Sequence, residues 1–358
     1  MNFKFRILFL TLLSSLSLWS NEAMGTSELR VQLQYPTQVN DFILTEVENG
    51  SLVLRPVGRD VGSRVYLELE DLKRARVVLN FLFPKEYYDA IEQMELRNAS
   101  RALPALRRHS SPLLDYLALS SLPGNLQPAV ISYIDVLSAT GEWKDAVDVA
   151  MRIPIPDSSP QALRRIGKLA FELQENGEAA ELDRLQNYIT SYETLPREQL
   201  EVLMDLGDQW RESGEYLKAY KLYRIIQSNE GPDQIQARLW VAYCSFYLGH
   251  KIVPRVFLDT LPDMETSDPG YSLWELIQAR IRIENGDFTN AMRMVAEGKM
   301  YSSAADPWYP ELLHTLAILY GELGLTEASV SAHREVSTLF PNSKWAAESL
   351  SILDNNQI

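Results

Sequence analysis

Six glycines recur along this chain at nearly constant intervals, and their spacing limits the fold more than any other feature. They are Gly141, Gly177, Gly214, Gly249, Gly286 and Gly324, with steps of 35 to 38 residues. Five of them follow a small residue seven positions earlier, such as Gly207 or Ala317. Glycine ends a helix without a Cβ penalty, and small residues let two helices cross closely. The spacing predicts six helical hairpins that need neighbours to cover their apolar faces.

One repeat is especially complete. Its characteristic residues are Leu206, Gly207, Trp210, Gly214, Tyr216, Ala219 and Tyr223. In this pattern the chain resembles the tetratricopeptide repeat (TPR) proteins over residues 126–355, and the resemblance implies a right-handed, all-α solenoid. The period is longer than the family's usual length of about 34 residues. The unit around Gly249 also has Pro254 where an alanine is expected, which predicts a shortened or bent second helix.

The residues before the repeats follow a different pattern. Between residues 29 and 83 apolar and polar side chains alternate, and the turn signal Asn49-Gly50 separates two such runs. The alternation predicts four or five short strands, including runs at 65–69 and 75–83. We therefore expect a small β-rich region over 26–83, similar to an SH3-like unit or partial barrel, a degenerate helical lead-in over 84–125 and the solenoid over 126–358. The β-rich region is either a cap for the first repeat or a second binding module.

The first residues have the pattern of an export signal. Lys4 and Arg6 precede a mostly apolar run at 7–18, which is shorter than an ordinary membrane span. Ala23-Met24-Gly25 offers a small-x-small cleavage site. The pattern predicts a cleavable signal peptide over 1–25 and a periplasmic or secreted protein that is not a lipoprotein and has no integral span after cleavage. The alternative is an uncleaved anchor or a buried first helix.

Composition and motifs argue against several functional classes. The net charge of −14 disfavours nucleic acid and anionic membrane surfaces as partners. Cys244 is the only cysteine, and no two of the four histidines have the four-residue spacing of paired zinc ligands. The sequence has no nucleophile elbow and no glycine-rich phosphate loop. We therefore predict a protein that is not an enzyme and that has no catalytic residues, cofactor or metal.

The helix around Cys244 is unusual because it is apolar on all sides. Between residues 239 and 248 only Ser245 is polar, whereas a solenoid helix normally keeps one face for solvent. The resemblance to TPR proteins implies that the first helix of each unit lines a concave groove. In register with Gly249, the groove residues would be Tyr243, Phe246 and Tyr247, which suggests an aromatic anchor for a partner. Alternatively, the solenoid curls tightly enough to bury them.

The same register places charged residues of neighbouring units in the groove. They are Asp208 and Arg211 one unit earlier and Arg280 one unit later. The Lys, Asn and Arg set with which some TPR proteins bind chaperone C-termini is missing. We predict a non-enzymatic scaffold or adaptor of the bacterial cell envelope that binds a segment of an envelope protein. The alternatives are a glycan-binding protein or hydrolase that uses an acidic cleft or the β-rich region, and self-association through the end helices at 345–353.

Overall fold

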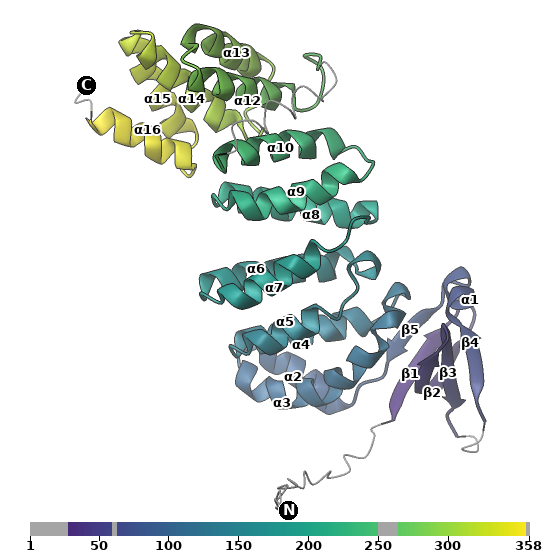
Figure 1. The fold of residues 1–358 in the computed structure, drawn as a ribbon. Helices are drawn as coiled ribbons and strands as arrows, with labels where there is room; N and C mark the ends of the chain where they lie inside the picture. Colours follow the sequence, from purple (N-terminus) through teal and green to yellow (C-terminus); the bar gives the residue numbers. More distant parts are fainter. Residues whose placement is uncertain (1–27, 59–62, 250–263, 356–358) are drawn as a thin grey trace, which may run out of the picture. The chain divides into compact units, whose positions relative to one another are not determined.

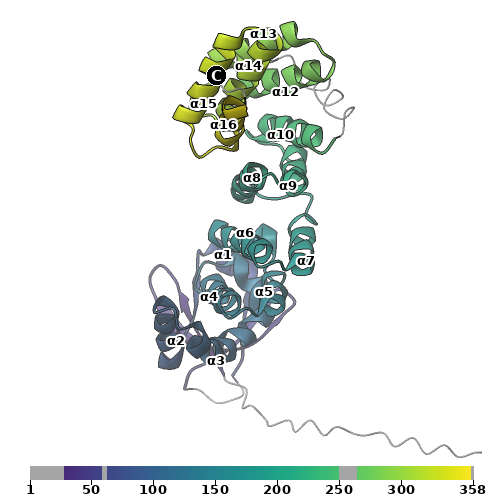
Figure 2. The same ribbon diagram turned by 90° about the vertical axis from the view of Figure 1, so that its left-hand side faces the viewer.

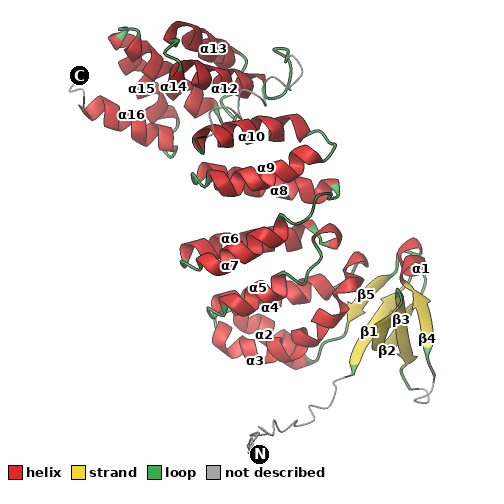
Figure 3. Cartoon of the chain, viewed as in Figure 1, coloured by secondary structure: helices red, strands yellow, loops and turns green. Residues whose placement is uncertain are grey.

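A computed structural model describes residues 28–58, 63–249 and 264–355. Contacts within the chain define two compact units, Met1–Phe83 with Leu122–Gly124, and Pro84–Ser121 with Asn125–Ile358 (Figure 1). The expected signal peptide at 1–25 and the expected helix containing Pro254 lie outside the described residues. Strands occupy the first unit and helices the second, apart from one short helix next to the sheet (Figure 3).

The first unit is an antiparallel sheet with the strand order β4-β3-β2-β1-β5. Its elements are β1 (Leu29–Gln34), β2 (Val39–Glu48), β3 (Ser51–Pro56), β4 (Val65–Glu68), α1 (Leu69–Arg74) and β5 (Val78–Phe81). Val31, Leu33 and Leu79 alternate with more exposed residues and are almost fully buried. Asn49 and Gly50 have φ angles of 50° and 79°, as a two-residue hairpin turn requires. The expected small β-rich region is therefore confirmed.

The predicted strand at 65–69 is one residue too long, because the chain enters helix α1 at Leu69. Leu69 and Leu72 are three residues apart and so share a helical face, and Leu72 is buried. Acidic residues occupy the first turn of α1 and basic residues the last, which suits the helix dipole. The last apolar run likewise contains a strand only at Val78–Phe81, and Arg76 before it has a φ of 52°.

The second unit is a TPR-like solenoid of helical hairpins (Figure 2). Its first elements are α2 (Lys85–Glu95), α3 (Ala99–Ser110), the 3₁₀ segment η1 (Ser111–Ser121), α4 (Leu126–Ala139), α5 (Trp143–Ala150), the 3₁₀ turn η2 (Ile155–Asp157), α6 (Pro160–Glu175) and α7 (Ala179–Ile189). It continues with α8 (Arg197–Glu212), α9 (Tyr216–Ser228), α10 (Gln234–Tyr247), α12 (Tyr271–Glu284), α13 (Phe288–Met300), α14 (Tyr309–Glu322), α15 (Thr326–Leu339) and α16 (Lys344–Asn355).

The periodic glycines end helices as the sequence predicts. All six have positive φ angles, between 74° and 82°. Five of them connect two described helices of a hairpin, and the sixth, Gly249, follows α10. Gly207 shows why a small residue is needed seven positions before the turn, because a Cβ there would lie 2.8 Å from the ring of Tyr223. The hairpins therefore form at the spacing the sequence predicts.

Candidate functional site

Residues 239–245 of helix α10 are all buried, and its aromatic residues contact other helices of the solenoid. Trp240 is fully buried and lies 5.7 Å from Trp308, between ring centroids. Tyr243 is 4% exposed, whereas Phe246 and Tyr247 are half-buried. The unusual apolar character of this helix thus has a structural explanation, because residues around α14 cover the face that would otherwise meet solvent.

Glu311 in the first turn of α14 is the centre of these contacts and is only 2% exposed. Its carboxylate accepts hydrogen bonds from the Tyr243 hydroxyl at 2.5 Å and the Tyr247 hydroxyl at 2.6 Å. Arg280 donates to it from Nη2 at 2.9 Å and from Nε at 3.2 Å. We call these four residues the Glu311 network. It joins α10, α12 and α14 and compensates a buried charge.

The ionisation states of the Glu311 network follow from burial and charge. Burial and the adjacent Glu311 carboxylate raise the pKa of Tyr243 well above its usual range, so this hydroxyl stays a donor. Burial opposes the charge on Arg280, but Glu311 and the two tyrosines together outweigh this effect and raise the pKa of that guanidinium. Arg280 is therefore a permanent cation beside a carboxylate, and the network stabilises the contact between its helices.

Lys344 at the start of α16 lies among aromatic rings. Its Nζ is 5.1 Å from the centroid of Tyr216, 5.3 Å from Tyr247 and 4.3 Å from Trp345. Tyr216 and Tyr247 stack on each other with centroids 4.6 Å apart. Nζ also donates a hydrogen bond to the Tyr216 hydroxyl. These cation–π contacts connect α16 with α9 and α10, which are distant in sequence.

Arg211 on α8 is the second cation of this region, and only 6% of it is exposed. Its guanidinium lies over Trp240, 4.0 Å from the ring centroid. Nη2 makes two long contacts, 3.4 Å to Asp208 and 3.3 Å to Glu212. Nε is buried and has no hydrogen-bond partner in the described part of the chain. Asp208 also accepts a hydrogen bond from the Tyr223 hydroxyl at 2.6 Å, so its carboxylate interacts with both Tyr223 and Arg211.

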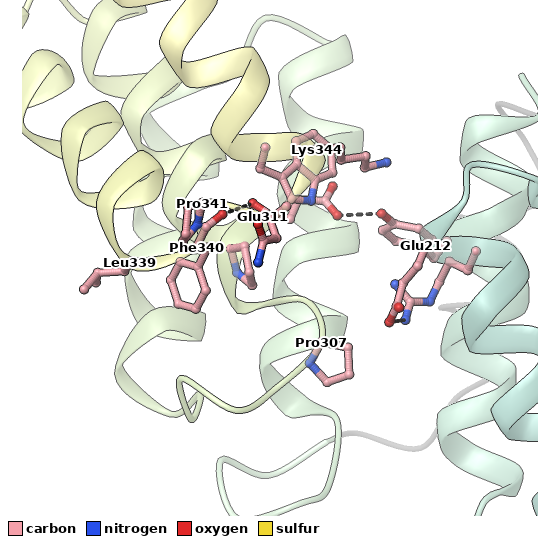
Figure 4. A pocket seen from close by; sticks show the side chains of 13 residues that line it. Glu212, Pro307, Glu311, Leu339, Phe340, Pro341 and Lys344 are labelled. Atoms are coloured by element: carbon pink, nitrogen blue, oxygen red, sulfur yellow. Dashed lines mark hydrogen bonds and ion pairs between the residues drawn. The ribbon is translucent and has the colours of Figure 1, made fainter.

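A pocket of about 430 Å³ opens beside these groups; we call it the Arg211 pocket. Its lining residues are Arg211, Glu212, Tyr243, Pro307, Pro310, Glu311, Leu339, Phe340, Pro341, Asn342, Ser343, Lys344 and Trp345. Figure 4 shows Glu212 on one side of the pocket and Phe340, Pro341 and Lys344 on the other. The volume is in the range of ordinary ligand pockets, and the lining mixes apolar and charged groups.

The structure distributes the six predicted groove residues over several places. Tyr243, Tyr247 and Arg280 meet in the Glu311 network, and Arg211 and Tyr243 line the Arg211 pocket. Phe246 is not among the lining residues and contacts Tyr247, with ring centroids 5.6 Å apart. Asp208 lines a different pocket between α6 and α8, about 570 Å³ in volume.

Sequence reasoning missed several residues of this site. Glu311, Lys344 and Trp345 were not among the predicted groove residues, although all three line the Arg211 pocket. Pro341 and the residues after it form the last repeat junction, and a proline three residues before a helical segment was a visible signal. Nothing in the repeat spacing indicates that this junction contacts α9 and α10, because those contacts depend on how the hairpins stack.

Other candidate chemistry lies inside the helical core. The hydroxyl of buried Ser349 is 2.9 Å from His314 Nδ1 and 3.0 Å from His333 Nδ1. Burial, with a further contribution from His333, lowers the pKa of His314 to about 4. Burial raises the pKa of the Cys244 thiol to about 12. Within residues 28–58, 63–249 and 264–355, no three His, Cys, Asp or Glu residues are grouped as a metal site.

Two carboxylates meet at the hydroxyl of Tyr271. This hydroxyl lies 3.0 Å from Glu275 Oε1 and 2.8 Å from Glu297 Oε1. Burial raises the pKa of Glu275, and its other oxygen is buried without a partner among the described residues. Neither carboxylate lines the Arg211 pocket or the pocket between α6 and α8.

Comparisons with known proteins concern the fold. No protein-family model matches the chain, and no curated protein is significantly similar to it. One similar solved structure is PilW, described as a widely conserved type IV pilus biogenesis factor, which is 12% identical with a TM-score of 0.35. The match includes 74% of this chain and 96% of PilW. The P58(IPK) TPR domain is 13% identical with a TM-score of 0.23, over 75% of this chain and 78% of the domain.

A structure of Naa15/Naa10 bound to HypK-THB is 15% identical over 75% of this chain, with a TM-score of 0.35, but the chain spans only 39% of that protein. Likenesses this remote concern the arrangement of helices and carry no information on function. In the described residues, no helix is both long enough and apolar enough to cross a membrane.

Proposed function

We propose that this protein is a non-enzymatic interaction scaffold that binds a segment of a partner protein in the concave groove of its solenoid. The observation that supports this most is the Arg211 pocket, where a buried cation adjoins aromatic rings and accessible apolar side chains. Buried aromatic and arginine side chains dominate the binding energy of protein interfaces. Leu339 at the rim is 57% exposed, which leaves apolar area for a partner to cover.

The Glu311 network has a positioning role in this proposal. It holds Tyr243 and Glu311 at the base of the pocket, and the hydrogen bonds of its carboxylate are used within the protein. Tyr243, Tyr247 and Arg280 then shape the site more than they contact the partner. Arg211, Lys344 and the segment Leu339–Pro341 are the groups left for contact with the partner.

We place the protein in the bacterial envelope because of the basic and apolar pattern of residues 1–18. N-terminal sequencing of the protein recovered from the envelope fraction tests this assignment. A chain beginning at Thr26 supports the proposed cleavage. An intact Met1 in a cytosolic fraction contradicts both the signal peptide and the envelope location.

Site-specific cross-linking tests the groove. A photo-reactive phenylalanine replaces Leu339, and in a control chain it replaces Leu325, which is 49% exposed and lies at the other end of α15. Irradiation of cells should give a protein adduct of defined mass from position 339 only. Lys344→Glu, which reverses a charge at the rim, should weaken this adduct. No adduct at 339, or the same adduct at both positions, would contradict the proposal.

A further inference from the structure

Arg211, which lines the pocket, has a buried hydrogen-bond donor without an acceptor among the described residues. The residue is 94% buried, because only 6% of its surface is exposed, and its Nε has no partner among the residues described. Guanidinium has five N–H donors in a rigid plane, and a buried donor without an acceptor costs free energy. The indole Nε1 of Trp240, whose ring lies beneath Arg211, is also buried and has no partner in the described part of the chain. These two buried donors therefore lack acceptors among the described residues.

The charge of Arg211 is also compensated only in part. Its contacts with Asp208 and Glu212 are 3.4 Å and 3.3 Å long, beyond the usual distance for a charged pair. The Asp208 carboxylate also accepts a hydrogen bond from the Tyr223 hydroxyl, and the side chain of Glu212 is 62% exposed to solvent. A buried cation with such weak partners gains most from an anionic acceptor that reaches its free edge.

Other donors line the same pocket. Lys344 has three N–H donors, of which the contact with Tyr216 uses one. Asn342 contributes a side-chain amide, and α16, which has 12 residues, begins at Lys344 with the positive end of its dipole. The acceptor Glu311 is already occupied by the Glu311 network. The pocket thus offers several free donors, and Glu212 at its exposed edge is the lining carboxylate that the Glu311 network does not occupy.

The apolar residues of the lining indicate what kind of molecule carries such an anion. Pro307 and Pro310 precede or begin α14, and Leu339, Phe340 and Pro341 form the opposite junction. These surfaces suit aliphatic or proline residues on both sides of the charged group, as an internal residue of a polypeptide would supply. A small free anion would leave them uncovered.

We propose that the Arg211 pocket binds the side-chain carboxylate of an aspartate or glutamate within an extended partner segment. The carboxylate accepts hydrogen bonds from Arg211 Nε and Lys344 Nζ, and its apolar neighbours pack on the two junctions. This inference rests on the proposed function as a scaffold and adds the chemistry of the partner. Glu201 and Asp205 of α8 lie outside this anchor, where solvent screens their charges. Glu212 lines the pocket itself, but its side chain is 62% exposed, so solvent screens its charge as well.

Defined peptides test the proposal. The probes are acetyl-Ala-Pro-Leu-X-Leu-Pro-Ala-amide with glutamate, glutamine or lysine at X, and a glutamine version with a free C-terminal carboxylate. Calorimetric titration uses protein expressed from the full-length chain. The glutamate peptide should bind roughly 10- to 100-fold more tightly than the glutamine peptide, as expected for hydrogen bonds to a charged group. The lysine peptide should bind more weakly still.

Matched variants locate the binding. Arg211→Gln should abolish the difference between the glutamate and glutamine peptides. Arg224→Gln is the control, because Arg224 also lies over an aromatic ring, that of Tyr220, but is exposed on α9. It should leave both affinities unchanged. If Arg211→Gln fails to fold, Lys344→Gln at an exposed rim position serves instead and should reduce the difference several-fold.

The outcomes separate this inference from the proposed function. Equal binding of the glutamate and glutamine peptides, preference for lysine, preference for the free C-terminus, or no binding at all would overturn the carboxylate proposal. An adduct from position 339 that Lys344→Glu weakens would still support the scaffold in each of these cases. If that adduct is also absent, both proposals fail.

Discussion

Replacement of Glu311 by glutamine tests the physical reasoning behind the site most directly. The substitution keeps the shape of the side chain and one acceptor oxygen but removes the charge. Arg280 then remains as a cation whose side chain is only 18% exposed, and one of the two tyrosine hydroxyls faces an amide donor. Removal of one partner from a buried ion pair costs about 3–5 kcal/mol. Because Arg280 keeps some access to water, we expect a loss of about 2–4 kcal/mol in the free energy of unfolding.

Local hydrogen exchange is the suitable assay, because repeat proteins can unfold in parts. Peptides from α10, α12 and α14 should exchange faster in Glu311→Gln, whereas peptides from α4 and α6 should not change. The matched control is Glu322→Gln on the exposed last turn of the same helix, which should stay within about 0.5 kcal/mol of the natural protein. If the two variants exchange alike, the Glu311 network does not hold these helices together.

Three further predictions concern the core. Unfolded histidine titrates near 6.5 and His314 in the folded protein near 4, so the unfolded state binds more protons between these pH values. The contribution of His314 to stability should therefore fall by up to about 3 kcal/mol as pH drops through this window, and denaturation at a series of pH values would show the slope. His314→Gln should reduce the slope without removing it, because burial also lowers the pKa of His333. Gly207→Ala should lower the free energy of unfolding by about 1–3 kcal/mol through contact with Tyr223, whereas Gly231→Ala, where a Cβ meets nothing within 4 Å, should not, as urea denaturation would show. Cys244 should resist thiol reagents until the protein unfolds, and labelling at the rate of a free thiol in the folded protein would contradict its burial.

The repeat architecture was predictable because it depends on local requirements. A residue such as Gly214 at the end of a helix needs a positive φ, and a position such as Gly207 needs to be small, wherever the neighbouring units lie. Helix α1 was missed because its six residues carry too little periodicity to distinguish a helical turn from a strand. Short segments of this kind are fixed by their surroundings more than by their own sequence.

The site was only partly predictable because its contacts span long stretches of chain. Sequence register located Tyr243 and Arg280, but their common partner Glu311 lies 68 and 31 residues away. Whether such residues meet depends on the angle at which each hairpin stacks on the last, and small angular differences accumulate over several units. The partner of a buried charge therefore became visible only in three dimensions.

The distribution of charge explains why recognition would concentrate in so small an area. Within the Glu311 network the carboxylate is paired with Arg280 and with two hydroxyls, so these groups have little to offer an incoming ligand. Arg211 differs because it is equally inaccessible to bulk water yet incompletely paired. In the free protein, the buried Arg211 donor without an acceptor already costs free energy, and a partner that supplies this acceptor removes that cost. A partner that contacts only exposed acidic residues gains little binding energy, because it replaces contacts that those residues already make with water. Specificity should therefore depend on the fit of one acidic residue to Arg211 more than on the net charge of the partner.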